Sequence, residues 1–292
     1  MKIKGPVLAA TALDPAGDEV IRQAAAHATA ANVSLVVCHI VPETYAIQPI
    51  FPDMRASDRA YAEAARKGIL AAAEGQSRRV IPDKPPATTI RVEAGSPHSK
   101  VLQVADEVGA GLVVVGAGAN QRGGSLSGVA ERIIRHAQCP VLTTRRSSGA
   151  AVLAATDFSD PALPAMEAGK DEARRRSRRF VAIHSVEVRV LPVASPEASQ
   201  ASLLAHLINS EQKRATAALE EIASGYGPES SYVVGIGPPA DAILDAAAQH
   251  SAELIVVGTH GRSGFRRLTL GSVAESVVRR ASCSVLVVRL AT

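Results

Sequence analysis

Short apolar runs rich in β-branched residues alternate along the chain with longer stretches in which alanine and leucine recur at helical spacing. The apolar runs predict strands at 6–12, 33–40, 88–93, 111–116 and 140–144, and again at 151–157, 179–186, 231–235, 253–258 and 284–289. Two of the longer stretches, 58–77 and 201–224, carry charges between their apolar positions and predict helices with one buried face. This alternation is typical of parallel sheets whose strands are joined by right-handed helical crossovers.

The same plan occurs twice in the chain. The run Val-Leu-Ala-Ala-Thr at 7–11 returns unchanged at 152–156, and Leu-Val-Val-Val-Gly at 112–116 is matched by Leu-Ile-Val-Val-Gly at 254–258. A repeat of this length indicates duplicated domains. We therefore predict two tandem Rossmann-like α/β domains, 1–146 and 150–292, each a five-stranded parallel sheet with helices on both faces.

Composition agrees with a parallel sheet under alanine-rich helices. The chain is 47% hydrophobic with only 4 Tyr, 4 Phe and no Trp, so its cores must be built from Ala, Val, Leu and Ile. No apolar run reaches the roughly 18 residues that span a bilayer, and Pro6 and Asp14 interrupt the apolar start. We therefore expect a cytoplasmic protein, with its three scattered cysteines buried as small apolar side chains.

A glycine-containing loop stands out in the second half. Gly258-Thr259-His260-Gly261 follows the predicted fourth strand, and after nine residues Gly271-Ser272 opens the next helix. In an open parallel sheet, ligands bind beyond the carboxyl ends of the strands, and a helix N-terminus favours an anion. The Ser272 hydroxyl and the Arg262 guanidinium would add donors for phosphate oxygens. The alternative is that such glycines only form turns and that the arginines are solvated.

A carboxylate lies at the end of the neighbouring strand. Thr156 and Asp157 end the first strand of the second half, which places Asp157 where it would accept a hydrogen bond from a base or a ribose. The alternative interpretation of Asp157 is an acid that caps a helix or closes a turn.

The pattern Gly-x2-Gly-x9-Gly-Ser makes the chain resemble a tandem member of the universal stress protein family, over nearly the whole of both halves. The resemblance implies the adenine nucleotide alpha hydrolase-like fold. In the ATP-binding branch of that family this loop wraps the phosphates and ribose, the acid after the first strand contacts the adenine side, and a backbone group after the second strand reaches the base. The positions that match here are Thr156, Asp157, Val186, Gly258, His260, Gly261, Arg262, Gly271, Ser272 and Val273. The implied ligand is ATP, which Mg²⁺ or Mn²⁺ would accompany, although no carboxylate cluster marks a metal site.

The first half departs from this pattern. Ala12 stands where Asp157 stands, Ala119 replaces Gly261, and Ser127-Gly128 falls where Gly271-Ser272 would be. We therefore predict a degenerate site in the first half and a structural role for that domain. The resemblance further implies that the last strands of the two halves pack across a pseudo-twofold axis as an intramolecular pseudo-dimer, and it leaves homodimerisation open.

Two other functions are compatible with these residues, a slow ATPase and a scaffold that binds no nucleotide. No Gly-x4-Gly-Lys-Ser/Thr is present, so rapid hydrolysis is not expected, and a slow ATPase would have only Asp157 or His260 to position water. A scaffold that binds no nucleotide would use both halves only as interaction surfaces. We favour a regulatory ATP-binding protein of the stress response, with an unknown protein partner and with enzymatic activity not expected beyond weak ATP hydrolysis.

A basic run lies at the end of the first predicted helix of the second half. Five arginines lie within 174–179, and the net charge is +4, which makes a surface for nucleic acid or an acidic partner conceivable. No aromatic residues alternate with the arginines to stack on bases. We therefore favour a solvated helix C-terminus, where cations complement the helix dipole.

Overall fold

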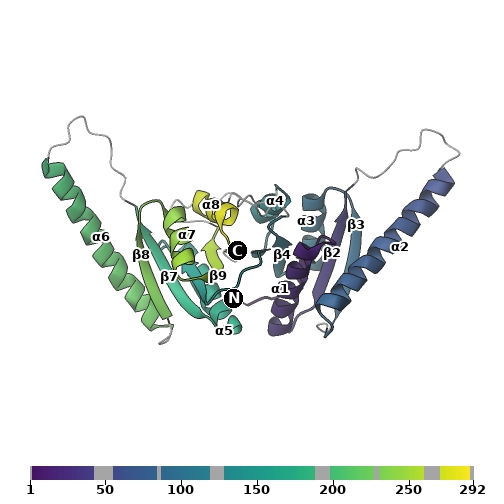
Figure 1. Ribbon diagram of the computed structural model, residues 1–292, viewed down its shortest axis with the longest axis horizontal. Coiled ribbons are helices and arrows are strands. Elements are labelled where there is room, and N and C mark those ends of the chain that lie inside the picture. The colour runs from purple at the N-terminus through teal and green to yellow at the C-terminus, as the bar shows by residue number, and fades with distance from the viewer. Residues whose placement is uncertain are drawn as a thin grey trace. The chain divides into compact units, whose positions relative to one another are not determined.

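The computed structural model describes residues 2–42, 55–83, 87–118, 128–187, 198–226, 230–259 and 270–289. The chain divides into two compact units, Lys2–Arg146 and Ser147–Thr292, and each unit contains its own sheet flanked by helices (Figure 1).

The sheet of the first unit is parallel throughout, with strands in the order β3-β2-β1-β4-β5. Its strands are β1 (Val7–Ala10), β2 (Leu35–Val41), β3 (Thr88–Ala94), β4 (Leu112–Gly116) and β5 (Val141–Thr144). The order reverses between β1 and β4, because the chain moves outward from β1 to β3 and then returns to the other side of β1. These strands lie within about two residues of the predicted ranges.

The helices of the first unit are α1 (Pro15–Ala31), α2 (Arg55–Val80), α3 (Pro97–Val108) and α4 (Gly128–His136). In α1 the Asp14 side chain accepts a hydrogen bond from the Gly17 amide at 2.8 Å, and Pro15 occupies the first turn, where its missing N–H has no intrahelical role. The helix ends at Asn32, which adopts a left-handed backbone with φ of 52°. α1 packs against α2, and α3 packs against α4.

The second unit repeats this architecture with the strand order β8-β7-β6-β9-β10, again parallel. Its strands are β6 (Ala151–Ala155), β7 (Arg179–Val186), β8 (Ser230–Ile236), β9 (Ala252–Gly258) and β10 (Ser284–Val288). Its helices are α5 (Leu163–Arg176), α6 (Ala198–Ser224), α7 (Pro239–Gln249) and α8 (Ser272–Arg280), with a 3-10 turn at Asp160–Ala162 before α5. The predicted fold class, two Rossmann-like units, is confirmed.

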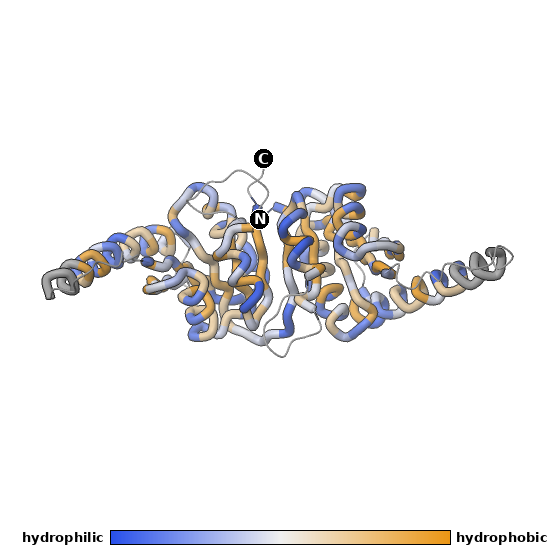
Figure 2. Tube along the Cα trace, turned by 90° about the horizontal axis from the view of Figure 1, so that it is seen from above, coloured by the Kyte–Doolittle hydropathy of each residue, from blue (hydrophilic) through white to orange (hydrophobic). Residues whose placement is uncertain are grey.

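The core of each unit is formed by strands that are buried on both faces. Orange hydrophobic segments gather along the strands inside each unit, whereas the helices alternate between orange and blue (Figure 2). The largest fully buried side chains include Leu8, Leu35, Leu112 and Leu142 in the first unit and Leu153, Ile183 and Leu254 in the second. Burial on both faces explains why the strands are continuous apolar runs in the sequence. No helix in the described ranges is long and apolar enough to cross a bilayer.

The arginine run at the end of α5 is more structural than its sequence predicts. Arg176 contacts Glu172 at 3.0 Å and Glu253 at 3.2 Å, and Arg178 contacts Glu253 at 2.9 Å. Both carboxylates are buried, and the Arg176 side chain is only 14% exposed. The prediction of a solvated helix end was therefore wrong for Arg176, because its guanidinium pairs with Glu172 one turn earlier in α5 and with Glu253 in the distant strand β9. Arg174 and Arg179 are exposed, as a solvated end requires.

Candidate functional site

The candidate site lies at the carboxyl ends of β6 and β9 in the second unit. These strands are neighbours, with Ala154 paired to Val256, so the residues that follow them reach the same edge of the sheet. β7 lies on the other side of β6, which makes the gap between β6 and β9 the point where the strand order reverses. Open parallel sheets bind ligands at this point.

The loop after β6 is held by its own side chains. The Thr156 hydroxyl oxygen accepts a hydrogen bond from the Phe158 amide at 3.0 Å, and Thr156 is buried. The Asp157 carboxylate accepts from the Ser159 amide at 3.1 Å and from the Ser159 hydroxyl. Asp157 therefore closes a turn, as its alternative interpretation has it, and at the same time places a partly buried carboxylate at the edge of the sheet.

Phe158 has an unusual backbone conformation that the sequence did not predict. Its backbone adopts the left-handed conformation, with φ of 62°, although it is neither glycine nor asparagine. Its ring packs on the His184 imidazole with 4.3 Å between centroids and an interplanar angle of 34°. His184 belongs to β7, and its Nδ1 atom lies 2.8 Å from the Thr156 carbonyl oxygen. An aromatic pair thus links the loop after β6 to the neighbouring strand.

Val186 lies at the end of β7, and its carbonyl oxygen accepts a hydrogen bond from the Gly237 amide at 3.0 Å. The Val186 carbonyl is therefore hydrogen-bonded on the side of β7 that faces β8. The Ile183 carbonyl accepts from the Thr156 amide at 2.9 Å, so the odd-numbered residues of β7 turn their backbone groups toward β6. By that alternation the backbone groups of Ser185 point toward β6, whereas its hydroxyl donates to the Gly237 carbonyl at 2.8 Å. The resemblance implies Val186 for the backbone contact with the base, and spacing alone does not tell on which side a strand residue forms its hydrogen bonds.

The residues on either side of the loop after β9 lie at the other side of the site. Gly258 ends the strand, and the buried Thr259 donates its amide to the Val288 carbonyl at 3.0 Å. The Gly271 amide donates to the Thr259 carbonyl at 2.9 Å, which brings the start of α8 back to the end of β9. A side chain on Gly271 would place its Cβ 3.0 Å from that carbonyl oxygen, so a larger residue there would press on the backbone of Thr259.

α8 begins beside this turn. Gly271 is the residue before the helix and has no side chain with which to cap the first turn, and Ser272 is exposed. The first amides of a helix have no intrahelical acceptor, so this end of α8 offers donors for an anion. Val273 is half-buried in the same turn. His260, Gly261 and Arg262, the remaining predicted contacts, lie outside the described residues.

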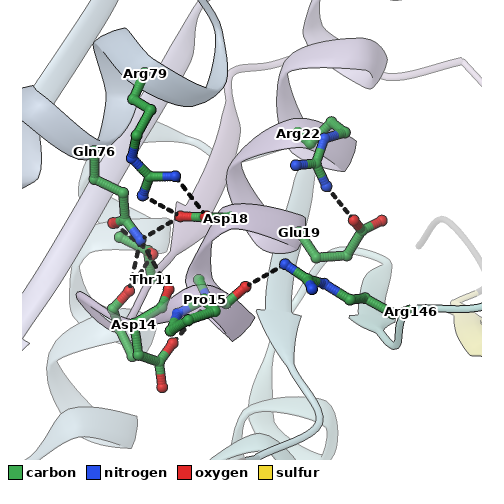
Figure 3. A network of polar contacts seen from close by, with 11 residues as sticks. Thr11, Asp14, Pro15, Asp18, Glu19, Arg22, Gln76, Arg79 and Arg146 are labelled. Atoms are coloured by element: carbon green, nitrogen blue, oxygen red, sulfur yellow. Dashed lines mark hydrogen bonds and ion pairs between the residues drawn. The ribbon is translucent and has the colours of Figure 1, made fainter.

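In the first unit the corresponding loop follows β1, and the Gln76 side chain is hydrogen-bonded to it. The Gln76 amide nitrogen, from α2, donates to the Ala12 carbonyl at 3.2 Å, to the Asp14 carbonyl at 3.0 Å and to the Asp18 carboxylate at 2.9 Å. Figure 3 shows Gln76 directed between Thr11, Asp14 and Asp18. Ala12 supplies no carboxylate at the position of Asp157.

Asp18 is the centre of this network. Arg79 donates to its two carboxylate oxygens at 2.8 Å each, and the Asp18 side chain is only 9% exposed (Figure 3). The hydrogen bonds from Arg79 are the main cause that lowers the pKa of Asp18 below its usual value, with Gln76 acting in the same direction against the effect of burial. The residue at the matching position of the second unit is Leu163, which is 54% exposed, so this network belongs to the first unit alone.

Among the residues that the structure describes, no three His, Cys, Asp or Glu side chains come close enough to hold a metal ion.

The fold and site together define a tandem doubly wound α/β protein with a glycine-containing turn at the switch point of its second sheet. The family model described as "Universal stress protein family" matches residues 5–145 and again 150–289. The chain therefore belongs to the universal stress protein family.

Relatives within the family are similar over either one unit or both. A universal stress protein of Methanocaldococcus jannaschii is 34% identical over 134 residues, which is 46% of this chain and 78% of that protein. One from Mycobacterium tuberculosis is 28% identical over 276 residues, 88% of each chain. Among solved structures, a universal stress protein from Archaeoglobus fulgidus has a TM-score of 0.60 at 19% identity and covers 98% of this chain and 96% of that chain. This last likeness is one of fold.

Proposed function

We propose that the second unit binds an adenine nucleotide, ATP foremost, and that the chain is a regulatory protein of the stress response in the cytoplasm. The observation that carries this proposal is the turn in which the Gly271 amide bonds the Thr259 carbonyl. This turn sets the open N-terminus of α8 at the same sheet edge as Asp157. An acceptor for a base or ribose and a set of donors for phosphate thus lie on two sides of one switch point.

The residues that would hold the nucleotide fall into two groups. Gly258, Gly271, Ser272 and Val273 would surround the phosphates with backbone amides and one hydroxyl, and His260, Gly261 and Arg262 would complete that loop. Thr156 and Asp157 would meet the base or ribose, with a backbone group at the end of β7. Mg²⁺ or Mn²⁺ would be bound through the phosphates, where it would neutralise part of their charge.

The proposed action is regulatory. Nucleotide bound to the loop between Thr259 and Leu270 would change the surface that this loop offers to a protein partner. The first unit would act as a structural partner, because Ala12 removes the acid and Gln76 already engages the backbone that follows β1. The residues of the site offer a phosphate cradle without the lysine of a P-loop, so rapid hydrolysis is not proposed.

Calorimetric titration with ATP and Mg²⁺ tests the proposal. The parent protein is expected to bind about one nucleotide per chain, and Gly271→Ala is expected to weaken binding at least about tenfold because its Cβ would press on the Thr259 carbonyl. Gly261→Val should abolish binding. Gly128→Ala is the matched control, since nothing lies within 4 Å of a Cβ at that position in the first unit.

The two rival functions have distinct outcomes. A parent protein that binds no ATP would favour the scaffold that works without a nucleotide. ATP turnover that copurifies with the protein and falls in Asp157→Ala would instead favour a slow ATPase.

A further inference from the structure

The loops that follow the first strand of each unit differ in the conformation of one residue. Phe158 in the second unit has a φ of 62°, whereas its counterpart in the first unit, Leu13, is not among the described residues with positive φ. The left-handed conformation brings Cβ of an L-residue close to the following carbonyl oxygen and is unfavourable outside glycine and asparagine. It persists only where surrounding contacts hold it, and such residues cluster at functional sites.

Two contacts hold Phe158 in this conformation. Its amide donates to the Thr156 hydroxyl oxygen at 3.0 Å, and its ring lies on His184 with 4.3 Å between centroids. His184 is itself fixed, since its Nδ1 atom lies 2.8 Å from the Thr156 carbonyl. The Thr156 hydroxyl therefore holds the Phe158 amide, and His184 holds both the Phe158 ring and the Thr156 carbonyl.

The Asp157 carboxylate depends on this turn. Its Oδ1 atom accepts from the amide and the hydroxyl of Ser159, which follows Phe158 directly. If residue 158 returned to a right-handed or extended backbone, Ser159 would leave this position and the carboxylate would lose both donors. In the first unit, where Ala12 has no carboxylate to place, the matching residue is Leu13 and no such conformation is needed.

We propose that Phe158 is a positioning residue for the base side of the nucleotide site: its ring, packed on His184, holds the left-handed turn that aims the Asp157 carboxylate at the base or ribose. This inference rests on the proposed nucleotide binding by the second unit. The phosphate side, at Gly271 and Ser272, is formed by a different loop and does not depend on Phe158.

The experiment compares two ligands on three variants. ATP carries base, ribose and phosphates, whereas inorganic tripolyphosphate carries only the phosphate part. Phe158→Leu, which gives the second unit the residue of the first, is expected to weaken ATP binding about tenfold and to leave tripolyphosphate binding within about twofold of the parent. Phe158→Tyr keeps the ring and should restore ATP affinity. Leu13→Ala, the matched change in the first unit, should alter neither ligand.

The outcomes separate this inference from the proposed function. A parent protein that binds neither ligand overturns both. A parent that binds ATP while Phe158→Leu binds it equally well overturns the inference alone, and so does a variant that loses ATP and tripolyphosphate to the same extent. Should Phe158→Leu fail to fold, Phe158→Gly replaces it, because glycine adopts left- and right-handed backbone with similar ease and has no ring to hold the turn. It too should weaken ATP binding and leave tripolyphosphate binding within about twofold of the parent, and unchanged ATP binding overturns the inference.

Discussion

The Nδ1 atom of His184 lies 2.8 Å from the carbonyl oxygen of Thr156, and this contact joins the second strand of its unit to the loop after the first. His39 makes the same contact with the Thr11 carbonyl in the first unit, at 2.9 Å. The surroundings of the two loops have diverged, since one holds an aromatic ring and the other a glutamine network. The histidine contact is therefore one of the features that both units keep, together with the bond from the threonine amide to the second strand.

This contact predicts the tautomer of both histidines. A carbonyl oxygen only accepts hydrogen bonds, so Nδ1 must carry the proton and Nε2 is left as the acceptor in the neutral ring. Long-range ¹H–¹⁵N NMR spectra at neutral or slightly alkaline pH should show the Nδ1–H tautomer for His39 and His184. The exposed His206 in α6 serves as the reference for a ring with no imposed tautomer. A dominant Nε2–H form at either position would contradict the assignment.

Two glycines in helices of the first unit should respond to alanine in opposite directions. A Cβ on Gly17 would lie 1.9 Å from the Ala12 carbonyl oxygen, so α1 would have to move away from the loop that it follows. A Cβ on Gly68 in α2 would meet nothing within 4 Å. We expect Gly17→Ala to lower the free energy of unfolding by about 2–3 kcal/mol through overpacking, and Gly68→Ala to raise it by up to about 1 kcal/mol through helix propensity. Urea titrations of the two variants beside the parent give both values, and equal shifts would refute the packing argument.

The buried carboxylate of Glu253 in β9 should matter more than any exposed arginine of the basic run. Arg176 and Arg178 both donate to it, at 3.2 and 2.9 Å. Removing it by Glu253→Ala leaves two guanidinium groups with fewer partners at a partly buried site, and we expect a loss of about 2–3 kcal/mol in the free energy of unfolding. Arg174→Ala, in the exposed part of the same run, should cost less than about 0.5 kcal/mol. A comparable loss in both variants would show that the ion pairs at Glu253 contribute nothing particular.

The inner strands were predictable because a parallel sheet with helices on both faces buries most side chains of a short run. The run 112–116 is apolar from end to end and forms β4 over those residues, and the charged helical pattern at 58–77 lies inside α2. The sequence singles out Gly271 by its spacing from Gly258, whereas its closeness to the Thr259 carbonyl is known only from the structure.

The interactions between distant residues were not predictable. Asp18 and Gln76 are 58 positions apart, and no local pattern says that the end of α2 reaches the start of α1. Arg176 meets Glu253 in the same way, which is why a run of arginines resembled a solvated surface. At Phe158 the left-handed backbone is imposed by the ring contact with His184, whereas sequence rules look for glycine or asparagine there.

The Asp18 network makes the stability of the first unit dependent on acid in a defined direction. Hydrogen bonds from Arg79 and Gln76 lower the pKa of Asp18 in the folded protein below the value of 3.8 for an unperturbed carboxyl. The unfolded chain therefore binds the proton more readily than the folded one. The contribution of Asp18 is fully present above about pH 5 and is lost as the pH falls below 3.8 and through the lowered folded pKa.

Asp18→Asn tests this linkage, because it keeps the shape of the side chain and removes its charge. We expect the free energy of unfolding of the variant to be about 1–2 kcal/mol lower than that of the parent at pH 7 and at pH 5, since the Arg79 and Gln76 donors lose a charged acceptor. At about pH 3 the difference should shrink, because protonation of Asp18 in the parent reproduces the change. Asp14→Asn retains a capping side chain for the Gly17 amide and is the control, with an expected change below about 0.5 kcal/mol. Urea titrations at the three pH values measure the differences, and a gap between parent and Asp18→Asn that stays constant down to pH 3 would show that Arg79 does not hold the carboxylate as the structure has it.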